Sequence, residues 1–92
     1  MSDIAIRHDT RRHRFEIEVE GHVGHVEYAR HGRVLSIDHT IVPDAIGRRG
    51  IAGQLVLAAV EFARDEGLKI APNCSYAAAW MDRHPEYASL RA

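Results

Sequence analysis

The stretch that decides the fold begins at Pro43, ends at Gln54 and reads PDAIGRRGIAGQ. It contains three glycines and two arginines, and it stands where an alternating strand pattern gives way to a helical one. Glycine permits positive φ and a close approach of a ligand to the backbone, and the free N–H groups of a first helical turn attract an anion. One interpretation is therefore an anion-binding loop that runs into a helix, with Val42 to Phe62 as the complete unit.

A second interpretation of this loop needs no ligand. Gly47 then makes a turn, Arg48 and Arg49 are solvated, and Gly50 and Gly53 let the helix pack closely against a neighbour. In the first interpretation the two arginines instead add positive charge at the point where the anion binds. Because glycine-rich loops before helices are common, the residues alone leave both interpretations open.

Downstream of the loop, one long helix is predicted. Its apolar residues recur at helical spacing, at positions Ile51, Leu55, Ala58, Ala59, Phe62 and Ala63. Gly67 is the expected C-terminal cap, and Glu61 and Arg64 are expected to pair weakly on one helical face. After a short strand from Leu68 to Ala71, a second helix is expected from Ser75 to Asp82.

That second, short helix has two candidate caps. Either Asn73 or Ser75 can accept a hydrogen bond from its first turn, and Pro85 lies near its end. Tyr76 and Trp80 are four residues apart in it, so they are expected to pack on the sheet rather than to form a stacking platform.

Upstream of the loop, the sequence predicts four neighbouring strands. Apolar and polar residues alternate in two segments, Ile4 to Ile6 and Arg14 to Glu20. A third strand begins at Val23 after a turn, and a fourth runs from Val34 to Val42. The expected fold is α+β, with an antiparallel meander of four strands, a crossover helix, a strand parallel to the fourth, and a short C-terminal helix.

Composition limits what the chain can be. Its 92 residues, 46% of them hydrophobic, fit one small domain spanning residues 1–92, expected to be a monomer or a weak homodimer. A net charge of −1 supplies no general attraction to nucleic acid or to an anionic membrane. A cytoplasmic protein is expected for three reasons. The sequence has a single cysteine, Cys74, it shows no leader pattern, and it contains no run of roughly 20 apolar residues.

The histidines and the basic cluster are expected to be structural. No metal site is predicted, because the histidines are scattered without ligand spacing, at His8, His13, His22, His25 and His31 among other positions. Arg11 to Arg14 is expected to be a solvated hairpin tip.

Four short motifs together resemble a known family. They are HTIVP at 39–43, GIA at 50–52, PNCSY at 72–76 and RHPEY at 83–87. At these residues the chain is similar to the GNAT superfamily of N-acetyltransferases, and in particular to its very small single-domain members. The superfamily's loop pattern has Arg or Gln, two variable residues, Gly, one variable residue, then Gly or Ala. Gly47 stands here in its first position, so the backbone of 49–52 is expected to make most of the phosphate contact.

The resemblance implies that acetyl-CoA, as cosubstrate, lies between two splayed parallel strands. Its pyrophosphate would rest on backbone N–H groups from about Arg48 to Gly53, and the backbone at Val42 would face the thioester. Arg83 and His84 would lie near the adenine or its ribose phosphate. The expected coenzyme contacts are Val42, Gly47, Arg48, Arg49, Gly50, Ile51, Ala52, Gly53, Asn73 and Tyr76.

The resemblance also names candidates for catalysis. His39 could serve as a base, and Asp38 would point to the opposite face of a regular strand. Cys74 would lie beside the coenzyme sulfur and could accept the acetyl group, or it could be an inert small apolar residue. Met81 occupies the place of a tyrosine acid in larger relatives, so Tyr76 or Tyr87 would have to substitute for it.

The predicted activity is N-acetyl transfer from acetyl-CoA to an unidentified amine. Two alternatives stay open at this point. The chain could bind coenzyme A without turnover, since Met81 cannot donate a proton, or it could be an interaction adaptor that has kept the fold and lost the ligand.

Overall fold

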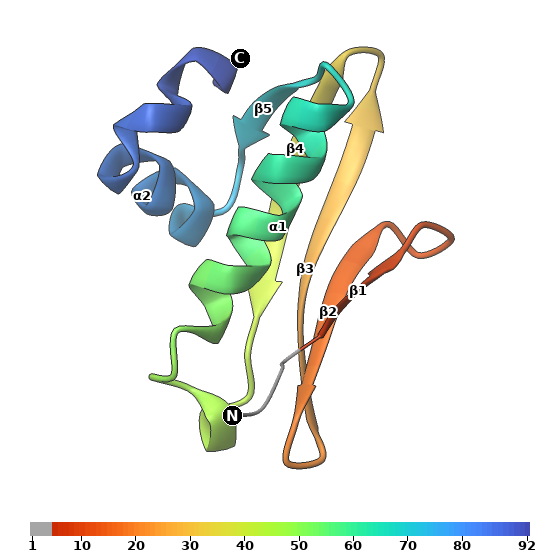
Figure 1. Cartoon of the computed structure of the whole chain (residues 1–92), viewed down its shortest axis with the longest axis vertical. Coiled ribbons are helices and arrows are strands. Elements are labelled where there is room, and N and C mark those ends of the chain that lie inside the picture. Colours follow the sequence, from red (N-terminus) through yellow and green to blue (C-terminus); the bar gives the residue numbers. More distant parts are fainter. Residues whose placement is uncertain (1–4) are drawn as a thin grey trace.

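A single five-stranded sheet organises the molecule (Figure 1). The structure is a computed structural model that describes residues 5–92. The strands follow one another in the order of the sequence, and all neighbours are antiparallel except the last pair, which is parallel. Their bounds are β1 (Ile6–Asp9), β2 (Arg14–Val19), β3 (His22–His31), β4 (Val34–Ile41) and β5 (Lys69–Pro72). This confirms the α+β meander with its parallel crossover.

The first strand lies further along the chain than predicted. It ends at Asp9, with His8 paired to Phe15, whereas the alternating pattern indicated Ile4 to Ile6. Ile4 lies outside the described residues. The prediction stopped early because a histidine interrupts the apolar alternation. In the structure the His8 ring stacks on Phe15, with centroids 4.0 Å apart, and shares a hydrogen bond with the Tyr28 hydroxyl.

Helix α1 (Ile51–Asp65) connects β4 to β5 and packs on one face of the sheet. Its end confirms the predicted cap. Gly67 has a φ of 71°, its N–H donates to the carbonyl of Arg64, and the next N–H donates to the carbonyl of Ala63. The predicted Glu61–Arg64 pair is wrong, because the Arg64 guanidinium lies 3.4 Å from the carboxylate of its neighbour Asp65 instead.

Helix α2 (Ser75–Arg83) lies beside α1 and contributes to the same core (Figure 1). Two 3-10 turns were not predicted, η1 (Asp44–Ile46) before α1 and η2 (Pro85–Leu90) after α2. The first has three residues and the second six, which is too short for a periodic signal in the sequence.

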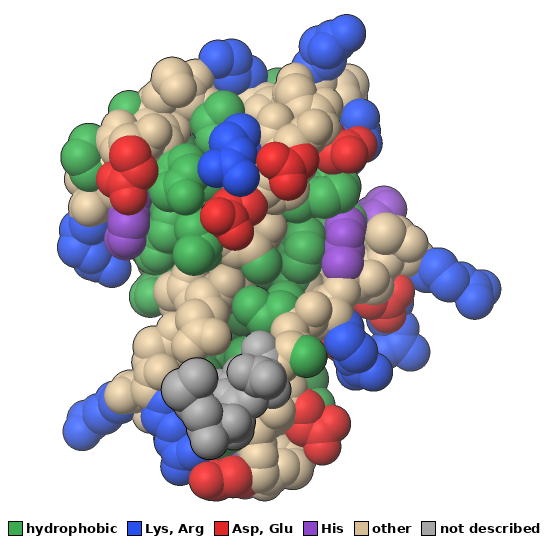
Figure 2. All heavy atoms as spheres, viewed as in Figure 1, with side chains coloured by type: hydrophobic (Ala, Val, Ile, Leu, Met, Phe, Trp, Pro, Cys, Tyr) green, Lys and Arg blue, Asp and Glu red, His purple; other side chains and the backbone are tan. Residues whose placement is uncertain are grey.

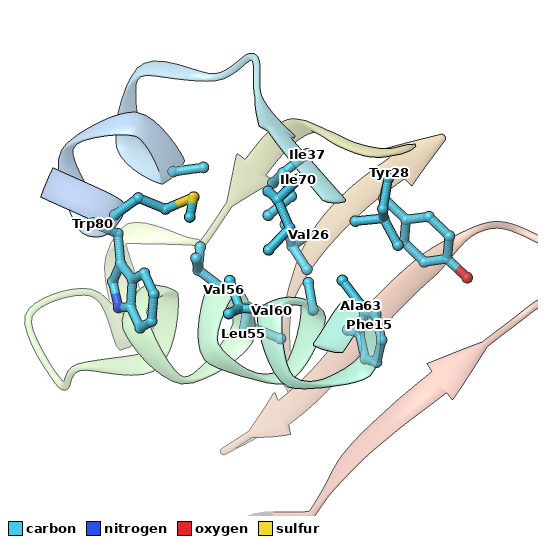
Figure 3. Close-up of a cluster of buried hydrophobic side chains, with 14 of the residues drawn as sticks. Phe15, Val26, Tyr28, Ile37, Leu55, Val56, Val60, Ala63, Ile70 and Trp80 are labelled. Atoms are coloured by element: carbon cyan, nitrogen blue, oxygen red, sulfur yellow. The ribbon is translucent and has the colours of Figure 1, made fainter. Parts of the chain in front are cut away.

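The hydrophobic core lies between the helices and the inward face of the strands (Figure 3). Leu55, Val56 and Val60 of α1 are fully buried, and Trp80 of α2 is 4% exposed. Figure 2 views this side, where hydrophobic side chains show around α1 and Lys and Arg side chains project at the rim. The sheet's other face carries charged side chains and two exposed apolar ones, Val23 and Ile41.

A β-bulge interrupts β4. Glu27 of β3 pairs with His39, and the next residue, Tyr28, pairs with Ile37, so that Asp38 is an extra residue on β4. Ile37 is fully buried on the helix face, and Thr40 faces the same side because it pairs with the buried Val26. Asp38 and His39, each next to one of these inward residues, therefore both project from the open face.

This corrects the expectation that Asp38 and His39 point to opposite faces. The expectation assumed a regular strand, in which side chains alternate without interruption. A bulge of one residue puts two successive side chains on the same side.

Candidate functional site

The glycine loop ends in an uncapped helix. Arg48 and Gly50 have φ values of 64° and 74°, and α1 begins directly after them. The first helical N–H that finds an acceptor is that of Gln54, which donates to the carbonyl of Gly50. Within residues 5–92, none of the backbone N–H groups of 48–53 donates to a protein acceptor. Unsatisfied donors at the positive end of a helix dipole form a site for an anion.

A hollow of about 240 Å³ adjoins most of this segment. Ile46 is the only lining residue that sequence reasoning missed. It is fully buried below the loop at the end of η1, a turn with no sequence signal. The other lining residues had all been proposed as coenzyme contacts: Val42, Gly47, Arg48, Gly50, Ile51, Ala52 and Tyr76.

Arg49 does not line this hollow. Its guanidinium is held by both carboxylate oxygens of Glu20, at 3.0 and 3.2 Å, in the turn between β2 and β3. The hydrogen bonds from Arg49 lower the pKa of Glu20, and the carboxylate in turn raises the pKa of Arg49. Of the two loop arginines, Arg48 is thus the one beside the hollow.

Gly53 is a point of close helix contact. A Cβ built there would lie 3.4 Å from the Tyr76 hydroxyl and 3.7 Å from Nε1 of Trp80. The close contact at Gly53 is what the interpretation without a ligand predicted. The backbone N–H groups without acceptors are what the anion-binding interpretation predicted. The two interpretations describe different glycines of the same loop.

Cys74 caps α2. Its sulfur accepts a hydrogen bond from the N–H of Ala77 at 3.3 Å and lies 3.4 Å from the Thr40 hydroxyl. The two predicted caps are therefore wrong. Ser75 is already the first residue of the helix, and the Asn73 amide donates instead to Asp38, at 3.2 Å. Sequence reasoning missed Thr40, because only the bulge turns it toward Cys74.

The parallel strands diverge at this point. Pairing between β4 and β5 ends at Ile37 and Pro72, and the N–H groups of Asn73 and Cys74 both donate to the carbonyl of Ile37. Past that carbonyl, two side-chain contacts bridge the strands. Cys74 meets Thr40, which faces the helix side, and Asn73 meets Asp38, which faces the open side.

The two predicted catalytic residues consequently do not share a face. Cys74 lies with Thr40 on the helix side, whereas His39 is exposed on the open side. A reaction that used both would take place in the opening between β4 and β5.

The residues near the C-terminus that were considered for the acid position and for the adenine end of the coenzyme differ in their surroundings. Met81 is 3% exposed and belongs to the core, and Tyr87 packs against Trp80. His84 stacks on the Trp80 ring with centroids 3.8 Å apart, and its Nδ1 lies 2.7 Å from the Trp80 carbonyl. Only Tyr76 has its side chain at the hollow. Proximity of Arg83 and His84 to an adenine stays a prediction.

Two larger hollows lie at the turn between β1 and β2, one of about 510 Å³ and one of about 310 Å³. Their lining is mostly charged. Asp9 accepts hydrogen bonds from the N–H groups of Arg11 and Arg12, and both arginines are exposed. An aspartate that closes its own turn accounts for this shape without a ligand. Within residues 5–92, no three His, Cys, Asp or Glu side chains lie close enough to hold a metal ion.

The fold is that of the GNAT-type acetyltransferases. Three features define it: the meander, the crossover helix with its unsatisfied N–H groups, and the divergent parallel strands. A family model described as GCN5-related N-acetyl-transferase matches residues 14–90. The chain belongs to this family. In the part of the chain described, no helix has both the length and the apolar character needed to cross a membrane.

Individual relatives agree with this assignment. Human protein NATD1 is 37% identical over 86 residues, which are 89% of this chain and 75% of NATD1. Protein NATD1 of Xenopus tropicalis is 35% identical over 88 residues, 91% of this chain and 80% of that protein. A GCN5-like protein of Staphylococcus aureus, solved by NMR, superposes with a TM-score of 0.78 at 29% identity and covers all of this chain and 91% of its own.

Proposed function

We propose that this protein is an N-acetyltransferase that transfers the acetyl group of acetyl-CoA to an unidentified amine. The observation that carries the proposal is the row of backbone N–H groups at residues 48–53, which donate to no acceptor within residues 5–92; four residues of this row, Arg48, Gly50, Ile51 and Ala52, line the hollow. A coenzyme A pyrophosphate supplies the acceptors and the negative charge that such a row lacks. Membership in the GCN5-related family supports the same cosubstrate.

The residues around the hollow fit the coenzyme in kind. The N–H groups and Arg48 suit the phosphates, and apolar Val42, Ile46 and Ile51 suit the pantetheine arm. Asn73 stays a proposed coenzyme contact, with its amide nitrogen already donating to Asp38. Arg49 contributes charge near the loop while it remains paired to Glu20.

Cys74 supports a route through an acetylated enzyme. Its sulfur accepts a hydrogen bond from the Ala77 N–H at the start of α2 and lies 3.4 Å from the Thr40 hydroxyl, two contacts that fix its position. The thiolate attacks the acetyl carbonyl, the bond from carbon to the coenzyme sulfur breaks, and that sulfur leaves and takes up a proton. The amine then attacks the Cys74 thioester, loses a proton to a base, and the cysteine sulfur leaves.

His39 is the base we propose for the second step. It is exposed beside the opening between β4 and β5, on the face opposite Cys74, so that the amine and the coenzyme approach from different sides of the sheet. We further propose that residues 1–92 act as one cytoplasmic domain, as a monomer or a weak homodimer.

Intact-mass spectrometry tests the acetyl-enzyme. Purified protein incubated with acetyl-CoA should gain one acetyl group, and the Cys74→Ala variant should gain none. Cys74→Ser is the matched control for side-chain size. Thiol release with a panel of amines measures turnover. A protein that forms no adduct and releases no thiol above background is not an acetyltransferase.

A second function, coenzyme A binding without turnover, is favoured by Met81. This residue stands where larger relatives place a tyrosine acid, and it is buried in the core. Calorimetric titration with coenzyme A separates the cases. Binding without adduct or thiol release identifies a binding module, and absence of binding at millimolar ligand rules out both functions.

A further inference from the structure

Glu27 stands opposite the bulge that turns His39 outward. It is the one residue of β3 that faces two residues of β4, Asp38 and His39. Cross-strand partners have Cβ atoms about 4.5–5.5 Å apart, which is within reach of a glutamate and a histidine. The two residues are therefore cross-strand neighbours on the open face, and in this structure no hydrogen bond or ion pair joins the Glu27 carboxylate to the His39 imidazole.

The Glu27 carboxylate is held from one side only. Its Oε2 atom lies 2.8 Å from Nε2 of His25 and 3.7 Å from the guanidinium of Arg14. Arg14 is itself fixed by Glu16, at 3.4 Å. The other oxygen, Oε1, makes neither a hydrogen bond nor an ion pair with any residue between 5 and 92. One oxygen is thus anchored and the other is available.

We infer that Glu27 is a positioning residue: when the His39 ring turns toward it, the free oxygen accepts a hydrogen bond from the ring and so orients it for proton abstraction. The inference rests on the proposed acetyl transfer and extends it. His25 and Arg14 hold the carboxylate in place, and Asp38 is engaged by Asn73, which leaves Glu27 as the carboxylate that can orient His39.

The proton balance is simple in this arrangement. As the amine nitrogen forms its bond to the acetyl carbon, it gives its proton to the ring nitrogen of His39 that faces the opening. The other ring nitrogen keeps its hydrogen, which it donates to Glu27. The electron pair of the broken C–S bond goes to the departing sulfur, and His39 later releases the proton to solvent or to that sulfur. A carboxylate that fixes the tautomer of a base has this role in catalytic triads.

The competing explanation is a structural charge ladder. Arg14, Glu16 and Glu27 would then only stabilise the sheet face, and His39 would act, if at all, without help. The two explanations differ in which step of the reaction a Glu27 variant slows, because a structural loss affects both half-reactions and a positioning loss affects only the second.

The test compares Glu27→Gln with Glu18→Gln. Glu18 lies on the same face, in β2, and makes no ion pair inside the described region 5–92, so it is the matched control. Acetylation of Cys74 by acetyl-CoA should be unchanged in both variants. Transfer from acetyl-Cys74 to an amine should fall about tenfold or more in Glu27→Gln, up to the roughly 10²–10⁴-fold that a general base contributes. Equal rates for Glu27→Gln and wild type overturn the inference.

A spectroscopic measurement keeps the inference testable apart from turnover. In protein saturated with coenzyme A, long-range ¹H–¹⁵N spectra report the tautomer and hydrogen bonding of each histidine ring. Glu27→Gln should change the ring signals of both His25 and His39, and Glu18→Gln should change neither. A change at His25 alone refutes the role of Glu27 toward His39. Absence of both acetyl-Cys74 and thiol release in wild type refutes the proposed transfer instead, so the two failures are distinct.

Discussion

Replacing Gly50 by alanine should destabilise the protein through backbone conformation alone. Gly50 has a φ of 74° and a ψ of 13°, in the left-handed region, where an L side chain costs about 1–2 kcal/mol. A Cβ at this position meets no atom within 4 Å, so no steric clash adds to that cost. We expect the free energy of unfolding to fall by about 1 kcal/mol, which lowers Tm by roughly 4–8 °C in a domain of this size.

Gly53→Ala is the matched control, because it makes the same chemical change three residues later. There the new Cβ would be in ordinary contact with the Tyr76 hydroxyl at 3.4 Å, and alanine is favoured over glycine in a helix by about 0.5–1 kcal/mol. Gly53→Ala should therefore unfold at or above the wild-type temperature, while Gly50→Asn should recover part of the loss.

Thermal and urea unfolding followed by circular dichroism measure all three variants. Wild-type stability in Gly50→Ala would refute the reasoning, since the left-handed conformation would then cost nothing. So would an equal loss in Gly53→Ala, which would mean that any side chain in the loop is harmful.

Three further outcomes are expected. Burial lowers the pKa of His8, so the stability that this residue contributes is present above the unfolded pKa and is lost as the pH falls through the lower, folded value. The urea midpoint should therefore fall as the pH drops below about 6.5, and less in His8→Gln. Glu20→Gln frees Arg49, so calorimetry at low salt should give tighter coenzyme A binding, and an unchanged or weaker Kd contradicts this. Thr40→Val removes the hydroxyl near Cys74, and intact-mass time courses should show slower acetylation; an equal rate would exclude a contribution from that contact.

Most of the fold could be predicted because its signals are local. The strands β2 to β4 alternate in hydrophobicity, α1 has a helical period with glycine at its end, and the order of elements dictates a parallel crossover. The 3-10 turns have no such signal. The predicted range of the first strand was too early in the chain because His8 occupies an inward position. A histidine is accommodated there by its contacts with the rings of Phe15 and Tyr28.

The candidate site was predicted in part for the same reason. The glycine loop is a local motif, so most of its residues do surround one hollow. The partners of Cys74, Asn73 and Arg49 come from segments far away in the sequence, so only the folded structure reveals them. The bulge at Asp38 had the largest effect, because a strand of eight residues gives no sign in its sequence of where its alternation is broken.

The bulge residue Asp38 divides β4 into two halves that contribute to different parts of the molecule. Before Asp38, the inward side chains of Leu35 and Ile37 are buried in the core. After it, the inward side chain of Thr40 contacts the Cys74 sulfur. Substitutions in the first half should therefore change mainly the free energy of unfolding. Those in the second half should change mainly the rate of acetyl transfer. A variant that lacks Asp38 keeps each side chain on its own face but draws the second half back by about 3.3 Å, the rise of one strand residue. It would keep His39 and Thr40 but displace both relative to Cys74.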